Sequence, residues 1–268
     1  MRSSCCCGRL PAVQPYAEPP ILIRMANRLR IRPHGLALAL GLSGTVPLAG
    51  QDSTAPPESR RAITLGRVAP IGGLLVAAAL ADNGLRIWSQ RNRSDWGDRV
   101  ASVGDRFGEG RLVLPALGAV FLTARLAGWR TLSDDAFNTG RAVLTAGAVS
   151  LAMKVGFGRA RPVMAEGDAG HFRPFSSSDG FNALPSGHVT VAFALASSLA
   201  QRTTDRWVKR LFYAGASLTA FARVNYDKHW VSDVVAGALI GHFTARAVES
   251  GRLRAGIGPA GVTATLSF

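Results

Sequence analysis

Six apolar runs, separated by charged and polar stretches, dominate the chain between residues 68 and 240. The runs are rich in Ala, Leu and Gly, and none alternates between apolar and polar residues as a half-buried strand would. They are Val68–Ala81, Leu112–Ala124, Ala142–Met153, Val189–Ala200, Leu211–Ala222 and Val231–Ile240. This pattern predicts an all-α fold, a helical bundle of about six helices. The hydrophobic content of 47% is enough to give a chain of 268 residues a sizeable core.

The length of these runs bears on whether the helices cross a membrane. Each run spans about 10 to 14 residues, whereas a helix needs roughly 18 to 20 residues to cross the hydrocarbon layer. Charges that border the runs, such as Asp82, Arg141 and Arg210, would be costly at mid-membrane. We therefore expect a compact bundle on the outer side of the inner membrane. An integral membrane protein is the alternative, because longer windows such as 110–129 can span if their arginines reach the interface.

The N-terminal part of the chain has the order of an exported protein. A basic region after Met25 is followed by an apolar stretch over 36–48, the small pair Ala49-Gly50 and a polar segment. That is the order of a secretory signal peptide, and it favours Met25 as the true start. We interpret three parts here: a doubtful extension over 1–24, a signal peptide over 25–50 and a polar linker over 51–62. Export to the periplasm or cell envelope follows, with an integral inner-membrane protein whose site faces outside as the alternative.

The last residues show a different period. Val262, Ala264, Leu266 and Phe268 alternate with polar residues, which is typical of a strand. Because one strand cannot form a sheet alone, we expect residues 251–268 to be a C-terminal tail with at most a short strand.

The charge of the chain is strongly basic. Lys and Arg number 31 against 17 Asp and Glu, which gives a formal net charge of +14. The arginines are scattered and form no block of like charge, so the sequence does not favour a nucleic-acid partner. An anionic substrate or an anionic membrane surface fits the charge better.

The first of three polar clusters that interrupt the apolar runs consists of two cations. Lys154 and Arg161 are seven residues apart, so both can lie on one face of a straight helix, about 10 Å apart. Gly156, Gly158 and Pro162 favour a helix that bends or ends, which would let the two cations converge. Alone this cluster is weak, because cations commonly complement the dipole at the end of a helix.

The second cluster is Pro185-Ser186-Gly187-His188, which opens the run over 189–200. Ser186 is a preferred N-cap residue, and the free backbone N–H groups that follow it form an anion site that Gly187 lets a ligand approach closely. His188 then lies in the first turn, facing the bound anion. A well-capped structural helix is the alternative interpretation.

The third cluster joins Arg223, His229 and Asp233. The last two are four residues apart, so on a helix the carboxylate can accept a hydrogen bond from one imidazole nitrogen and leave the other free to attack. Arg223 lies six positions before His229, about 240° away on a continuous helix. A break over 225–227 is therefore expected if both face one ligand. An exposed His–Asp pair is the alternative.

Together the three clusters resemble the motifs of the phosphatidic acid phosphatase type 2 and vanadium haloperoxidase superfamily. That pattern is Lys, six residues, Arg-Pro; then Pro-Ser-Gly-His; then Ser-Arg, five residues, His, three residues, Asp. The chain matches it over residues 154–233, except that Ala222 stands where the pattern has Ser. The helical body extends the resemblance to 63–250, and the irregular segment 163–184 is expected to cover the pocket and shape substrate choice.

The resemblance implies a metal-independent phosphatase of phosphate monoesters. It makes His229 the nucleophile that forms a phosphohistidine, Asp233 the residue that orients it, and His188 the group that protonates the leaving oxygen and then activates water. Phosphoryl binding falls to Lys154, Arg161, Ser186, Gly187 and Arg223.

The implied substrates are a phosphorylated lipid or a small phosphomonoester, with a membrane surface as a further partner. No cofactor is implied, and no metal is expected, because the sequence shows no clustered carboxylates of the kind a catalytic metal needs. Two alternatives stay open: a haloperoxidase that holds vanadate in the same pocket, and a non-catalytic envelope protein that binds anionic lipid through its arginines.

Overall fold

A computed structural model describes residues 65–165, 167–176, 178–258 and 261–266. The doubtful extension, signal peptide and linker predicted over residues 1–62 lie outside the described residues, as do the three consecutive cysteines Cys5 to Cys7.

Within these ranges the fold is all-α, as predicted, with a short terminal hairpin. The elements are α2 (Leu65–Arg91), α3 (Asp95–Phe107), α4 (Gly110–Leu126), α5 (Arg130–Phe157), the 3₁₀ helix η1 (Asp179–Phe181), α6 (Gly187–Gln201), α7 (Arg206–Asn225), α8 (Val231–Glu249), β1 (Leu253–Gly258) and β2 (Gly261–Leu266). Each predicted run lies in a helix. The apolar runs did not predict α3. This helix has no continuous apolar stretch in its sequence, and it buries only Ala101 and Gly104.

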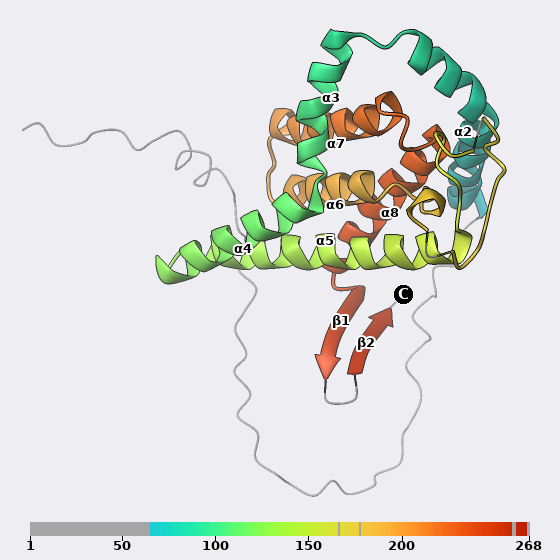
Figure 1. The fold of residues 1–268 in the computed structure, drawn as a ribbon. Helices are drawn as coiled ribbons and strands as arrows, with labels where there is room; N and C mark the ends of the chain where they lie inside the picture. Colours follow the sequence, from blue (N-terminus) through green and yellow to red (C-terminus); the bar gives the residue numbers. More distant parts are fainter. Residues whose placement is uncertain (1–64, 166, 177, 259–260, 267–268) are drawn as a thin grey trace, which may run out of the picture. The chain divides into compact units, whose positions relative to one another are not determined.

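Helix α6 holds the bundle together, packing against α5, α7 and α8 (Figure 1). Its buried face consists mainly of small residues, among them Ala192, Ala194 and Ala196, and small side chains let helix backbones approach closely. The approach is close at Gly237 of α8, where an added Cβ would lie 2.6 Å from the Ser186 carbonyl oxygen, and closer still at Gly241, where it would lie 2.3 Å from the Thr190 carbonyl oxygen. This close packing places the first turn of α6, which belongs to the second cluster, beside the first turn of α8, which contains Asp233.

The helices are longer than the apolar runs that predicted them, and this changes the membrane argument. By length and composition, Ala69–Arg91 in α2 and Val231–Glu249 in α8 can each cross a membrane, and α3 with α4, bent by 48°, forms a third candidate. Helix α2 also exposes several large apolar side chains: Leu74, Val76, Leu80, Leu85, Ile87 and Trp88. The run-length argument against spanning therefore fails, because polar residues at the ends of each run are still helical. The described helices are consistent with association with a membrane.

The C-terminal segment forms a two-stranded antiparallel hairpin. Leu253 pairs with Leu266 at one end and Gly258 with Gly261 at the other. The alternation over 262–268 did indicate a strand, but the expectation that it would lack a partner is wrong. The partner β1 was missed because its sequence, with two glycines and an arginine in six residues, does not alternate.

Candidate active site

The two cations of the first cluster converge on one residue. Helix α5 ends at Phe157, and Gly158 turns the chain with a left-handed φ of +58°. The Lys154 ammonium donates to the Asn182 carbonyl oxygen, and the Arg161 guanidinium donates to Asn182 Oδ1 at 2.9 and 2.7 Å. The predicted end of the helix is confirmed. Asn182 itself carried no signal in the sequence beyond its place in the segment expected to cover the pocket.

Lys154 and Arg161 both donate to Asn182, which is a neutral residue and does not cancel their positive charge. Burial, and then the positive charge of Arg161, lower the pKa of Lys154 to about 8. Burial, and then the charge of Arg223, lower the pKa of Arg161. Three cations thus lie close enough to repel one another, and an incoming dianion would relieve that repulsion.

The N-terminus of α6 faces these cations. Ser186 is the N-cap, as predicted, but its hydroxyl makes no capping bond and is buried with no hydrogen-bond partner among the described residues. An added Cβ on Gly187 would lie 3.5 Å from Lys154 Cε and 4.0 Å from Ser150 Oγ. The Ser150 hydroxyl is likewise buried without a partner in the described part of the chain. Such groups are costly unless a ligand satisfies them. Ser150 was missed because it lies in an apolar run, where only its four-residue spacing from Lys154 hinted at a role.

Arg223 lies at the end of α7 and is 3% exposed. Its Nη1 donates to Asp105 Oδ1 at 2.5 Å, and its Nε has no partner among the described residues. The break expected over 225–227 is present: α7 ends at Asn225 and α8 begins at Val231. The His229 N–H donates to the Arg223 carbonyl at 3.3 Å, so the turn folds back on this arginine. Ala222, where the family pattern has Ser, is fully buried.

His229 is held by a backbone carbonyl. Its Nδ1 lies 2.8 Å from the Ala183 carbonyl oxygen and 3.8 Å from Asp233 Oδ2, and only the first distance is a hydrogen bond. Because a carbonyl can only accept, Nδ1 carries the proton and Nε2 keeps its lone pair. The direct His229–Asp233 bond expected from helical spacing is absent, since His229 precedes α8 and does not lie within it.

Both oxygens of Asp233 bind other groups. Oδ2 accepts from the Trp230 N–H at 2.9 Å, which caps α8, and Oδ1 accepts from Arg159 Nη1 at 2.7 Å. Asp233 therefore fixes the start of α8 immediately after His229.

The electrostatics of His229 favour the neutral ring. Burial lowers its pKa to about 4; Asp233 opposes the shift, while the charges of Lys154 and Arg223 support it. At neutral pH the imidazole is uncharged, and it is ready to act as a nucleophile.

His188 is in the first turn of α6 and is less enclosed. Its side chain is 30% exposed, and Nε2 lies 3.4 Å from Glu109 Oε2. Burial and then the charge of Arg223 lower the pKa of His188, whereas Asp105 and Glu109 raise it. The ring can therefore exchange a proton with solvent and with a bound leaving group.

The expectation of no clustered carboxylates is wrong. Asp105, Glu109 and His188 each offer an atom, all within 4.8 Å of one another, of the types that bind divalent metals. The four-residue spacing of Asp105 and Glu109 was visible in the sequence, but their approach to His188, 79 positions after Glu109, was not. In the structure Asp105 pairs with Arg223 and Glu109 with His188, so both carboxylates already have cationic or ring partners.

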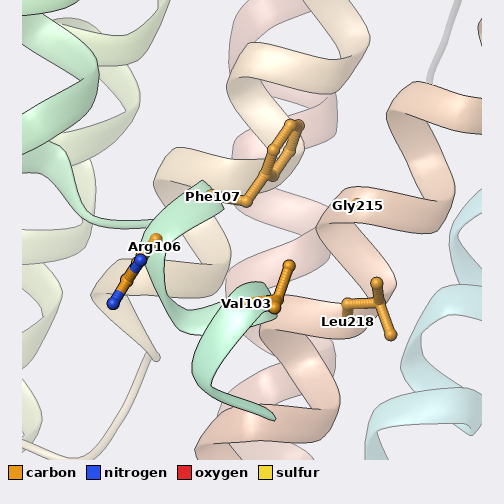
Figure 2. Close-up of a pocket in the computed structure, with 6 residues that line it drawn as sticks. Val103, Arg106, Phe107, Gly215 and Leu218 are labelled. Carbon is orange, nitrogen blue, oxygen red and sulfur yellow. The ribbon is translucent and has the colours of Figure 1, made fainter. Parts of the chain in front are cut away.

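A separate apolar groove lies between α3 and α7 and has a volume of about 390 Å³. Val103, Phe107 and Leu218 line it together with Gly104, Gly215 and Arg106 (Figure 2). None of the predicted site residues lines this groove.

Residues 136–254, which contain all three clusters, match the sequence model of the PAP2 superfamily. The site residues outside the matched segment are Asp105, from α3, and Glu109, from the α3–α4 connection.

Three known proteins show the extent of the similarity. The chain is 35% identical over 97 residues to a lipid A 1-phosphatase of Porphyromonas gingivalis, covering 35% of this chain and 19% of that protein. Its fold resembles LpxE of Aquifex aeolicus (TM-score 0.50, 19% identity, 62% of this chain and 93% of that one). It also resembles a transmembrane PAP2 type phosphatidylglycerolphosphate phosphatase of Bacillus subtilis (TM-score 0.52, 19% identity, 68% and 94%). The sequence match to the Porphyromonas gingivalis protein thus spans about a fifth of that protein's length.

Proposed function

We propose that this chain hydrolyses phosphate monoesters carried by lipids, through a phosphohistidine on His229 and without a metal. The observation that carries the proposal is the state of His229. It is a buried neutral imidazole whose Nδ1 proton is held by Ala183 and whose Nε2 makes no hydrogen bond among the described residues. The charges of Lys154 and Arg223 act on this ring.

Phosphoryl binding combines three partly or fully buried cations with polar groups at the start of α6, among them the Ser186 hydroxyl, which has no partner among the described residues. Lys154, Arg161 and Arg223 offset the negative charge of the equatorial oxygens, and the Ser186 hydroxyl and the Gly187 N–H donate to them. Stabilising this charge is the main requirement of phosphoryl transfer. Such an arrangement supplies the positive charge that Mg²⁺ supplies in other phosphotransfer enzymes.

Two chemical steps follow. His229 Nε2 forms a bond to phosphorus as the bond to the ester oxygen breaks, and His188 gives its proton to that leaving oxygen. His188 then takes a proton from a water molecule, which attacks the phosphohistidine and releases inorganic phosphate and free His229. Asp233 acts on His229 indirectly, by holding the chain that follows it.

The lipid part of the proposal has separate support. The Porphyromonas gingivalis relative is named for lipid A and the Bacillus subtilis neighbour for phosphatidylglycerolphosphate. Helix α2 presents a largely exposed apolar surface of sufficient length to span a membrane. We place the catalytic domain at residues 63–250, in an exported or membrane-inserted chain whose site faces outside the cytoplasm.

The test is phosphate release from a panel of lipid phosphates, polyprenyl diphosphates and small water-soluble monoesters, each with and without EDTA. Phosphate release from lipid phosphates that persists in EDTA is expected, and activity that EDTA abolishes would contradict the metal-free mechanism. Alkaline SDS quenching during turnover of ³²P-labelled substrate should trap a phosphoprotein that is stable in base and lost on later treatment with acid. His229→Ala should lose this adduct and reduce turnover by about 10⁴-fold or more, as loss of a nucleophile does elsewhere. Vanadate-dependent halide oxidation without phosphate release would favour the haloperoxidase.

A further inference from the structure

Asp82 is a buried carboxylate in a helix that is otherwise mostly exposed. On α2, Asp82 is fully buried and Ala78, one turn earlier, is nearly so, whereas large apolar side chains on the rest of the helix are exposed. A carboxylate inside an apolar helix long enough to span a membrane is costly and needs specific partners.

The partners of Asp82 lie at the start of α8. Asp82 Oδ1 accepts from the Ser232 N–H at 2.8 Å, and Oδ2 accepts from the Ser232 hydroxyl at 2.6 Å. Ser232 belongs to the first turn of α8, whose N–H groups have no partner within the helix. Asp82 therefore caps α8 from another helix. The residue that it binds, Ser232, lies three residues after His229.

Arg159 links Asp82 to Asp233. Its Nη2 donates to Asp82 Oδ2 at 2.8 Å, and its Nη1 donates to Asp233 Oδ1 at 2.7 Å and to the Ser232 hydroxyl at 2.6 Å. Arg159 is 5% exposed, so one buried guanidinium is shared by two buried carboxylates. Removing either carboxylate would leave an excess buried charge and shift the other partner.

We propose that Asp82 is a positioning residue for the His229 nucleophile, acting through Ser232, Arg159 and Asp233. The inference rests on the proposed function. It assigns α2 the task of fixing the start of α8, and with it the direction of His229 Nε2, from a helix outside the segment that matches the superfamily.

A second tie between α2 and the same region provides a matched control. Arg86 forms a two-bond ion pair with Asp227 at 2.7 and 2.6 Å, and its side chain is 26% exposed. It joins α2 to the turn before α8 but makes no hydrogen bond to Asp233 or Ser232 within the described residues. Loss of either the Arg86–Asp227 ion pair or the Asp82–Ser232 hydrogen bonds should weaken the packing of α2. Only loss of the Asp82 contacts should change the orientation of His229.

The experiment compares Asp82→Asn with Arg86→Gln in the full chain. Asp82→Asn should lower the rate of phosphohistidine formation, measured by rapid quench, by about 10- to 100-fold, with KM changed less than about twofold and the breakdown rate unchanged. Arg86→Gln should keep formation within about twofold at a similar loss of thermal stability. Equal slowing of formation and breakdown, or equal effects of the two variants, would overturn the proposal and leave Asp82 a structural residue.

Two further measurements keep the result decisive. If Asp82→Asn does not fold, Ser232→Ala removes the hydroxyl that joins Asp82 and Arg159 but keeps the amide, and it should slow formation in the same selective way. If the parent protein releases no phosphate from any substrate, the proposed function fails. The ¹⁵N resonances of His229 then still test positioning: a change of tautomer in Asp82→Asn but not in Arg86→Gln supports it, and unchanged resonances refute it.

Discussion

The two histidines that we propose to act in catalysis are held in opposite ways. The His229 side chain is 3% exposed and has a 2.8 Å bond to the Ala183 carbonyl, whereas that of His188 is 30% exposed and lies 3.4 Å from Glu109. A nucleophile must approach phosphorus along one line, so rigid burial suits it. An acid that serves first a leaving oxygen and then a water molecule needs access to both, and a looser contact suits that role.

The charges around the two histidines also differ, and so do the influences on their pKa values. Burial outweighs the other influences on His229 and lowers its pKa to about 4, so its lone pair is available throughout the neutral range. For His188, the carboxylates of Asp105 and Glu109 oppose the effects of burial and Arg223 on the pKa. The pKa of both rings is lowered, and the ring proposed as the acid is the one whose shift is opposed by two nearby carboxylates.

The largest expected effect that tests this division comes from His188→Ala. Turnover of an alkyl phosphate should fall by about 10²- to 10⁴-fold, because the leaving alkoxide needs its proton. With p-nitrophenyl phosphate, whose leaving group needs little protonation, the first step should be much less affected and phosphohistidine should accumulate. Quench-flow with both substrates measures this. His171→Ala is the control, because within the described residues the ring of this loop histidine packs on Phe181 and bonds to none of the site residues. Failure to accumulate the adduct in His188→Ala would contradict the role given to His188.

A second, intermediate effect concerns the cations that both histidines face. Lys154, whose pKa is lowered to about 8, should lose its charge as the pH rises through that value, and kcat/KM should fall above pH 8. Lys154→Arg keeps the charge at higher pH, so the fall should move to higher pH in the variant. The measurement is a pH profile of kcat/KM for both proteins. An unchanged alkaline limb in an active variant would assign that limb to another group.

The smallest effect is expected from Glu109→Gln. Because Glu109 raises the pKa of His188, its neutralisation should lower that pKa, and the acid form needed in the first step should be lost at lower pH. We expect a loss of about two- to fivefold in kcat at pH 7, of the size of one weak charge interaction. NMR titration of the His188 ring checks the direction, with Asp134→Asn as an exposed carboxylate control. A pKa of His229 that moved as much as that of His188 would erase the contrast between them.

Local features of the site followed from the sequence because short-range chemistry controls them. Ser186 before Gly187 made an N-cap, Gly158 ended α5, and the spacing from Arg223 to His229 required a break between helices, and all three occur in the structure. Each depends only on backbone preferences and on neighbours within a few residues. The helical class likewise followed from apolar runs, since burial of a helix face is visible in the order of residues.

The tertiary structure alone decided which groups hold these residues. The partner of His229 is the carbonyl of Ala183, and a carbonyl is present at every position, so no sequence pattern marks the one that will be used. Asp82 and Asp105 reach the site from helices 151 and 118 positions before Asp233 and Arg223, respectively. Contacts over such separations depend on how α2 and α3 pack, and that packing places the buried carboxylates where the motif residues need them.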